Sequence, residues 1–591
     1  MLGALAVGLF AWFLWPFVAH DARFPLGPDA PVYLWWARLA GEEGLSVVGE
    51  RPGVPALTLL LQGALGRSVV EATLSLEVAL GVSIGLGAAA VVRPRGRVAL
   101  LAGLLAGTFA VHLAAGYLAN LTMAAAFLAA AAALGTATKR GPWLAAGVMA
   151  AGGLAHPLFF VLGAMILLLT AAMTWRDDRA TAVRVAAAAI GAGAVVGAGM
   201  LSVLIGPSPP DVDTSRDAFL RRAGLGGELR SAYLDRFVHR WARYVQWASV
   251  PLAIVGLRDG STFLERFLRA WGVVLVAGVA VALATGWFPA DRFVTFGFVV
   301  PIAATLGLVR LVRWFEGRRL RTASVALAAI LVVAMLVGAF IAWNRQRPFM
   351  SEDEVTAATL ANASVPPRAE PRLPLVFLVD QRDGTLTFTA TRAGNVIRAA
   401  VSADRIRDVV VWVPPGGPND DAEREALENL TGRDVDAALD RSGQDAKVFA
   451  LTPFYDVDEF GVPREATVVD PATLATDVGN DAVEPLEPSS RATTAASAAL
   501  TLAFLWIAGY GWTRAVFTDK VSAAAAAVAV GAAVVMLTAI VVERLGVPLD
   551  APLGAWVASA VAGGGGYLMW LVLERRAVPN APPQVDEEPH E

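Results

Sequence analysis

The chain has 591 residues, of which 56% are hydrophobic and only 17% charged, and its mean hydropathy is +0.56. This composition excludes an ordinary soluble protein and indicates an α-helical protein that crosses a membrane many times. The lack of cysteine excludes disulfides, thiolate metal sites and a cysteine nucleophile, and the net charge of -4 says little because the sidedness of charge matters more than its sum.

The first predicted element is an apolar helix over residues 1–19, which we expect to be a retained span because no basic segment precedes it. The loop 20–68 follows, with a short apolar piece at 54–66 that we expect at the membrane interface. This loop begins with carboxylates and aromatic side chains: Asp21, Asp29, Tyr33, Trp35 and Trp36. Asp29 is either the N-cap of a surface helix or a general base, and the roles are compatible because a helix N-terminus keeps a carboxylate ionised.

Apolar runs along the rest of the chain complete a prediction of about 14 spans. They cover 1–19, 69–92, 98–115, 121–137, 142–155, 157–174, 184–206, 244–257, 270–288, 293–310, 323–343, 496–513, 522–542 and 553–573. Ionisable residues are rare inside them. Glu77 is the main exception and can be structural, and His112 is expected to be a hydrogen-bonded packing residue.

Arginines and lysines fall on one side if these spans alternate, and the positive-inside rule makes that side cytoplasmic. The basic segments are 93–97, 138–140, 176–184, 258–269, 313–321, 513–520 and 574–576. The same alternation places the segments 20–68, 207–243, 289–292 and 344–495 outside.

Several polar residues on the predicted outer side are candidates for a site. The loop 207–243 is rich in arginine, which can bind a lipid phosphate, although nearby acids also fit a solvated amphipathic helix. Arg292 lies in a tight turn and either contacts a phosphate or extends to the interface. His156 marks another outer turn, where a structural role competes with substrate binding. The candidates in the 207–243 loop are Arg221, Arg222, Arg236, Arg240, Tyr233 and His239.

Residues 344–495 are less hydrophobic and contain β-rich runs at 373–380, 395–402, 408–415 and 446–454, with a helical stretch at 419–432. This pattern predicts a small α/β domain inserted before the last three spans. No glycine-rich loop follows a strand to indicate nucleotide binding. The closing helices occupy 496–573, and the acidic, proline-rich tail at 574–591 is expected to be cytoplasmic and disordered.

The arrangement in residues 1–343 resembles the GT-C superfamily of membrane glycosyltransferases. The features that carry the resemblance are an acidic residue directly after the first span, here Asp29 or Asp21, and an outer arginine motif, here ADRFVTFGFVVP. Protein O-mannosyltransferases, aminoarabinose transferases, arabinofuranosyltransferases and oligosaccharyltransferase catalytic subunits share this plan. The resemblance implies that Asp29, with Asp21 in reserve, is the catalytic carboxylate and that Arg292 contacts the donor phosphate. Many members have paired acidic residues, whereas Ala30 follows Asp29, so no metal site is predicted and a bridging divalent cation is disfavoured.

The sequence thus predicts a multi-pass cell-membrane enzyme that moves a sugar from a polyprenyl-phosphate donor to an extracytoplasmic glycan, lipid or protein, with no nucleic-acid partner. Asp29 would act as base, and the arginines would stabilise the departing phosphate. Substrate contacts are predicted for Tyr33, Trp36, His156, Tyr233 and His239. The alternatives are a lipid or polysaccharide transporter or flippase, and a non-catalytic assembly scaffold.

Overall fold

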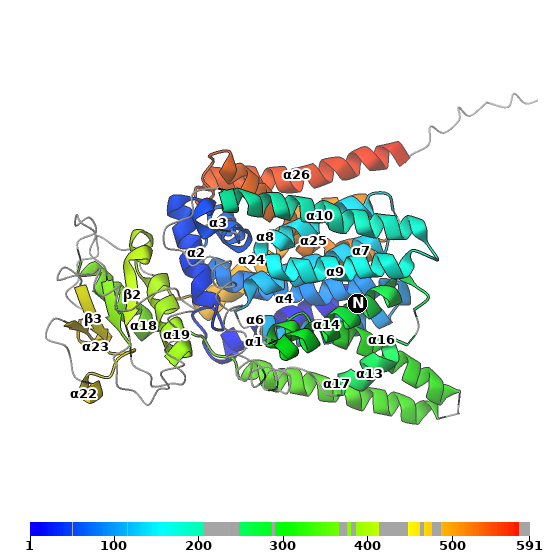
Figure 1. Ribbon diagram of the computed structural model, residues 1–591, viewed down its shortest axis with the longest axis horizontal. Helices are drawn as coiled ribbons and strands as arrows, with labels where there is room; N and C mark the ends of the chain where they lie inside the picture. Colours follow the sequence, from blue (N-terminus) through cyan, green and yellow to red (C-terminus); the bar gives the residue numbers. More distant parts are fainter. Residues whose placement is uncertain are drawn as a thin grey trace, which may run out of the picture.

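The computed structural model of the chain is predominantly helical, with a small sheet-containing part at one end of a helical bundle (Figure 1). It describes the residues 1–49, 51–114, 116–136, 138–205, 234, 238, 248–258, 260–285, 290–317, 320–365, 375–379, 386–412, 447–460, 466–474 and 486–577.

Nine helices in the described part of the chain are long and apolar enough to cross a membrane, and each coincides with a predicted span. They are α1 (Leu2–Ala19), α4 (Val69–Val92), α9 (Pro157–Thr174), α10 (Arg179–Ile205), α14 (Phe263–Thr285), α17 (Arg321–Asn344), α24 (Arg491–Val516), α25 (Lys520–Arg544) and α26 (Pro552–Ala577). The chain is therefore a multi-pass helical membrane protein.

The other five predicted spans correspond to shorter or more charged helices, so the count of 14 is not confirmed. The segment 98–115 divides into α5 (Val98–Phe109) and α6 (Val111–Ala114), and 293–310 into α15 (Asp291–Val294) and α16 (Val299–Glu316). The remaining three are α7 (Leu118–Leu134), α8 (Gly141–Ala155) and α13 (Ser249–Gly256). Helix α16 ends in a charged turn that contains Arg310, Arg313 and Glu316.

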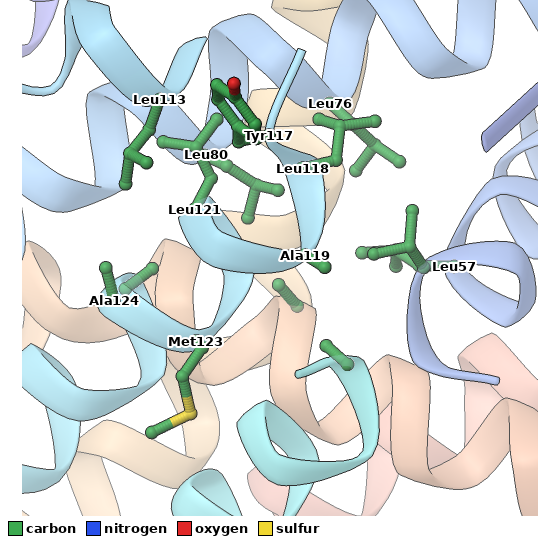
Figure 2. Packing of buried hydrophobic residues seen from close by; sticks show 14 of the residues in the cluster. Leu57, Leu76, Leu80, Leu113, Tyr117, Leu118, Ala119, Leu121, Met123 and Ala124 are labelled. Carbon is green, nitrogen blue, oxygen red and sulfur yellow. The ribbon is translucent and has the colours of Figure 1, made fainter. Parts of the chain in front are cut away.

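The apolar piece within the first loop was expected at the membrane interface, but it lies inside the bundle. It forms α3 (Gly53–Leu65), in which every residue except Gln62 and Leu65 is buried. Figure 2 shows Leu57 of α3 in one packed cluster with side chains of α4, α6 and α7. An apolar helix too short to span is accommodated here because neighbouring helices cover it on all sides.

The predicted basic loops meet at the end of the bundle away from the sheet. Glu265 at the start of α14 pairs with Arg95 of η2 (Arg93–Arg95) at 2.6 Å and with Arg310 of α16 at 3.3 Å. Arg93 pairs with Asp519 at 3.1 Å, and Arg266 pairs with Asp177 at 2.5 Å. These contacts place five separate segments at one end, as the alternation of spans predicts.

The opposite end carries a parallel sheet with the strand order β2-β1-β3-β4. The strands are β1 (Leu375–Leu378), β2 (Val409–Trp412), β3 (Lys447–Leu451) and β4 (Ala466–Val469). Around them lie α18 (Glu352–Ala363), α19 (Leu386–Ala400), η3 (Ala403–Asp408), α22 (Val457–Phe460) and α23 (Pro471–Leu474).

The predicted strand at 395–402 is wrong, because most of that segment is the end of α19. Its buried residues Ala393, Val396, Ile397 and Ala400 follow helical spacing, and this periodicity outweighs the β-branched composition. The other three predicted strands are found, and β4 is additional. The predicted helix at 419–432 lies outside the described residues.

Candidate functional site

The candidate site lies where the first loop meets the bundle, beneath the sheet-containing part. Helix α2 (Ala30–Glu43) begins there with Asp29 at its N-cap and Pro31 in its first turn, as predicted. The Asp29 side chain, however, accepts no hydrogen bond from the first turn of the helix. Asp29 is half-buried, and its side chain does not cap the helix.

Tyr33 is one turn further along α2 and is buried, with its hydroxyl accepting a hydrogen bond from the backbone N–H of Ala119 at 3.2 Å. Burial raises the pKa of Tyr33, and Asp29 raises it further, while the hydrogen bond from Ala119 and the charges of Arg51 and Arg292 oppose the change. One hydroxyl thus feels a carboxylate and two guanidinium groups from three separate segments.

Arg292 lies in the short helix α15, and its guanidinium carbon is 5.3 Å from the centre of the Tyr117 ring. Two contacts fix this turn against neighbouring helices. Asn120 of α7 donates to the Thr295 hydroxyl at 3.4 Å, and the Trp271 indole of α14 donates to the Phe296 carbonyl at 2.9 Å. Arg292 itself is half-buried.

His156 lies between α8 and α9 and has a structural role in this turn, one of its two predicted roles. Its Nδ1 accepts a hydrogen bond from Phe159 N–H at 3.4 Å, which caps α9. Burial lowers the pKa of His156 well below its ordinary value, and Arg51 and Arg292 lower it further. The ring is consequently neutral, and the same two arginines that act on Tyr33 also act on His156.

Buried donors without acceptors mark this neighbourhood. The Nε1 atoms of Trp35 and Trp36 and the Nε atom of Arg51 are buried and find no acceptor among the described residues. Trp36 also packs edge-on against Tyr33, with ring centres 6.0 Å apart. Because most buried donors in proteins are paired, these unpaired donors distinguish this neighbourhood from ordinary protein interior.

The segment before Asp29 is held from inside the bundle by Glu77. This residue of α4 is 1% exposed, and its Oε2 atom accepts a hydrogen bond from Leu26 N–H at 3.2 Å. Gly116, with φ +94°, lies so close that a Cβ atom there would be 2.5 Å from the Leu26 carbonyl oxygen. The acidic residue inside the span therefore positions the first loop.

Asp21, the reserve carboxylate, lies elsewhere. It is exposed and pairs with Arg491 Nε at 2.7 Å, at the start of α24. His112 is buried, hydrogen-bonds the Phe109 carbonyl and packs against Phe109 and Phe298, which confirms its packing role. Six other candidates lie outside the described residues: Arg221, Arg222, Arg236, Arg240, Tyr233 and His239.

The structure brings together Asp29, Tyr33, Trp36, His156 and Arg292 among the predicted residues, while their roles stay predictions. Sequence reasoning missed Arg51 and Tyr117. Arg51 could have been selected because it lies in a predicted outer loop, which was also the reason for selecting Arg292. Nothing in the apolar surroundings of Tyr117 separates it from a packing residue.

Within the described residues, no group of three or more His, Asp or Glu side chains is arranged to hold a metal ion. Comparison of the chain with protein-family models and with curated proteins gives no match.

Proposed function

We propose that the protein is an integral-membrane glycosyltransferase of the GT-C type, which moves a sugar from a polyprenyl-phosphate donor to an extracytoplasmic acceptor with inversion. The proposal rests on one observation. The Asp29 carboxylate, which makes no cap hydrogen bond, lies near Tyr33 together with the cations Arg51 and Arg292. These groups come from segments far apart in the chain, and they lie beside aromatic rings and unpaired indole donors.

The chemistry needs one base and one anion site. The Asp29 carboxylate takes the proton of an acceptor hydroxyl while that oxygen forms a bond to the anomeric carbon. The bond from this carbon to the phosphate oxygen breaks, and its electron pair leaves with the phosphate. Arg51 and Arg292 stabilise the negative charge that grows on the leaving group.

The α/β part is in a position to present the acceptor. Helix α19 packs along α2, and Arg38 of α2 donates to the Ala399 carbonyl of α19 at 2.5 Å. An acceptor held by this part would therefore be next to the helix that begins at Asp29. The basic end of the bundle would be cytoplasmic by the positive-inside rule, which makes the site extracytoplasmic.

The transporter alternative is less well supported. It needs ionisable groups that serve a path through the bundle, and Glu77 was the candidate. The hydrogen bond that Glu77 accepts from Leu26 N–H gives this residue a structural role at the site end instead.

The test is to replace Asp29 with Asn in the full-length protein. Transfer should fall by about 100-fold or more, since a positioned base contributes about 10²-fold to 10⁴-fold. In cells that lack the natural copy, the cell-envelope glycans are measured by mass spectrometry. Binding of undecaprenyl phosphate to the purified protein is measured in parallel and should be retained, because the arginines are intact.

Asp550→Asn is the matched control, because Asp550 is an exposed carboxylate in the loop before α26, at the same end. Normal glycans in cells that contain wild-type amounts of the Asp29→Asn protein would refute the catalytic role and favour a scaffold. Loss of transfer in Asp21→Asn but not in Asp29→Asn would move the role to the other carboxylate.

A further inference from the structure

A half-open cavity of about 490 Å³ lies at the basic end of the bundle, away from the candidate site. Its walls come from the α7–α8 connection, the end of α24 and the last turns of α26. The side chains that matter here are Lys139, Arg140, Arg514, Phe517, Trp570 and Glu574.

The polar lining is cationic. Lys139 and Arg140 are exposed and Arg514 is half-buried, and Glu574 is the one carboxylate in the lining. Arg140 donates to the Ala515 carbonyl at 3.2 Å and Arg514 donates to the Phe517 carbonyl at 3.4 Å. Each bond uses one guanidinium nitrogen and fixes the group, which keeps further N–H donors for a ligand. Fixed guanidinium groups beside a lysine suit a phosphate.

The rest of the lining is apolar and continues onto the outer face of α26. The Arg514 guanidinium carbon is 5.6 Å from the centre of the Trp570 ring, and Leu573 lies beside it in the wall. On α26, which forms an edge of the bundle in Figure 1, Leu568, Leu571 and Val572 are exposed. In a membrane helix such a face contacts hydrocarbon, so a ligand here can place a phosphate among the cations and an acyl chain along α26.

We propose that this cavity binds the headgroup of an anionic phospholipid, separately from the proposed sugar donor. The excess of cations selects a negatively charged headgroup, and the apolar face of α26 distinguishes a lipid from a free phosphate. Basic pockets between membrane helices at the cytoplasmic side commonly bind such headgroups.

The test is native mass spectrometry of the full-length protein with phosphatidylglycerol and with phosphatidylcholine. We expect retention of phosphatidylglycerol, and a loss of about fivefold to thirtyfold in its affinity for Lys139→Glu, the effect of one to two charges near a membrane surface. Glu574→Lys should increase the affinity. Arg97→Glu is the matched control, since Arg97 is exposed at the same end but does not line the cavity.

Three results would overturn the proposal. Equal losses in Lys139→Glu and Arg97→Glu would show a diffuse surface charge effect in place of a site. No gain in Glu574→Lys would contradict the assigned charge selectivity. Displacement of phosphatidylglycerol by inorganic phosphate or glycerol phosphate at matched concentration would show that the cavity takes a soluble phosphate.

Discussion

The two ends of the helical bundle treat their polar groups in opposite ways. At the basic end, the carboxylate of Glu265 is 5% exposed and bonds Arg95, Arg310 and the N–H groups of Ser261 and Thr262. At the other end, the Trp35 and Trp36 indoles and Arg51 Nε are buried without an acceptor among the described residues, and Asp29 makes no cap bond.

Paired polar groups at the basic end stabilise the fold, whereas the unpaired groups at the other end do not. A buried polar group without a partner costs about 1–3 kcal/mol, so a chain gains stability by pairing such groups wherever it can. The basic end follows this rule, because the ion pairs of Glu265 connect α14 with η2 and α16. The site end departs from this rule in several neighbouring groups, which is a pattern common at functional sites.

The largest effect expected from this comparison is a loss of transfer without a loss of stability in Arg292→Gln. Removing a group that stabilises transition-state charge should lower kcat by about 100-fold. The free energy of unfolding should change little by comparison, with the lost contact to the Tyr117 ring contributing about 0.5–1 kcal/mol. Undecaprenyl phosphate binding should also weaken, unlike in Asp29→Asn. A large drop in melting temperature would instead make Arg292 a structural residue.

The basic end should show the reverse pattern in Glu265→Gln. The free energy of unfolding should fall by about 2 kcal/mol, less than for a fully buried pair because Arg95 and Arg310 remain 38% and 23% exposed. Thermal unfolding in detergent measures it, with transfer per folded molecule unchanged. Arg93→Gln is the matched control and should cost at most about 1 kcal/mol, since Arg93 and Asp519 are 41% and 42% exposed. Equal effects of the two variants would contradict the importance assigned to Glu265.

The smallest effect concerns pH. Burial, followed by Arg51 and Arg292, lowers the pKa of His156 well below 6.5. As pH falls through about 6.5, the unfolded chain takes up a proton there and the folded chain does not, so stability is lost on acidification. The loss of stability amounts to about 1.4 kcal/mol when the pH is about one unit below the ordinary histidine pKa.

His156→Asn keeps a capping side chain and removes the titration. The difference in melting temperature between about pH 7.5 and pH 5.5 should therefore be smaller than in the wild type. An unchanged difference would mean that His156 is protonated in the folded protein.

Much of the fold could be predicted because long apolar runs and the sidedness of basic loops are local signals. The nine long apolar helices among the described residues and the gathering of basic segments at one end follow from them. The predicted strand at 395–402 failed because Val396, Ile397 and Val401 suggest β structure by composition while their surroundings repeat with helical spacing. Helix α3 was misplaced because an apolar segment of its length fits an interface and a protein interior equally well.

The candidate site was predictable only in part. Asp29 and Arg292 were found from their positions beside apolar spans on one side. Arg51 could not be ranked above other loop arginines, since its proximity to Tyr33 and His156 depends on how α2, α3 and α9 pack. The role of Glu77 was out of reach for the same reason, because its partner is a backbone N–H about fifty residues away.

The loop that leads to Asp29 depends on the far end of the chain. Asp21 pairs with Arg491, 470 residues later, and the Arg23 carbonyl accepts a hydrogen bond from Ser489 N–H at 2.9 Å. A ribosome adds about 5 to 20 residues per second, so these partners are made roughly 20 to 90 s after the loop itself. During that interval the helices up to α17 are made, and the loop gains its contact with Glu77 but still lacks these two partners. Chains truncated before Ser489 therefore lack both contacts that join the start of this loop to the closing helices.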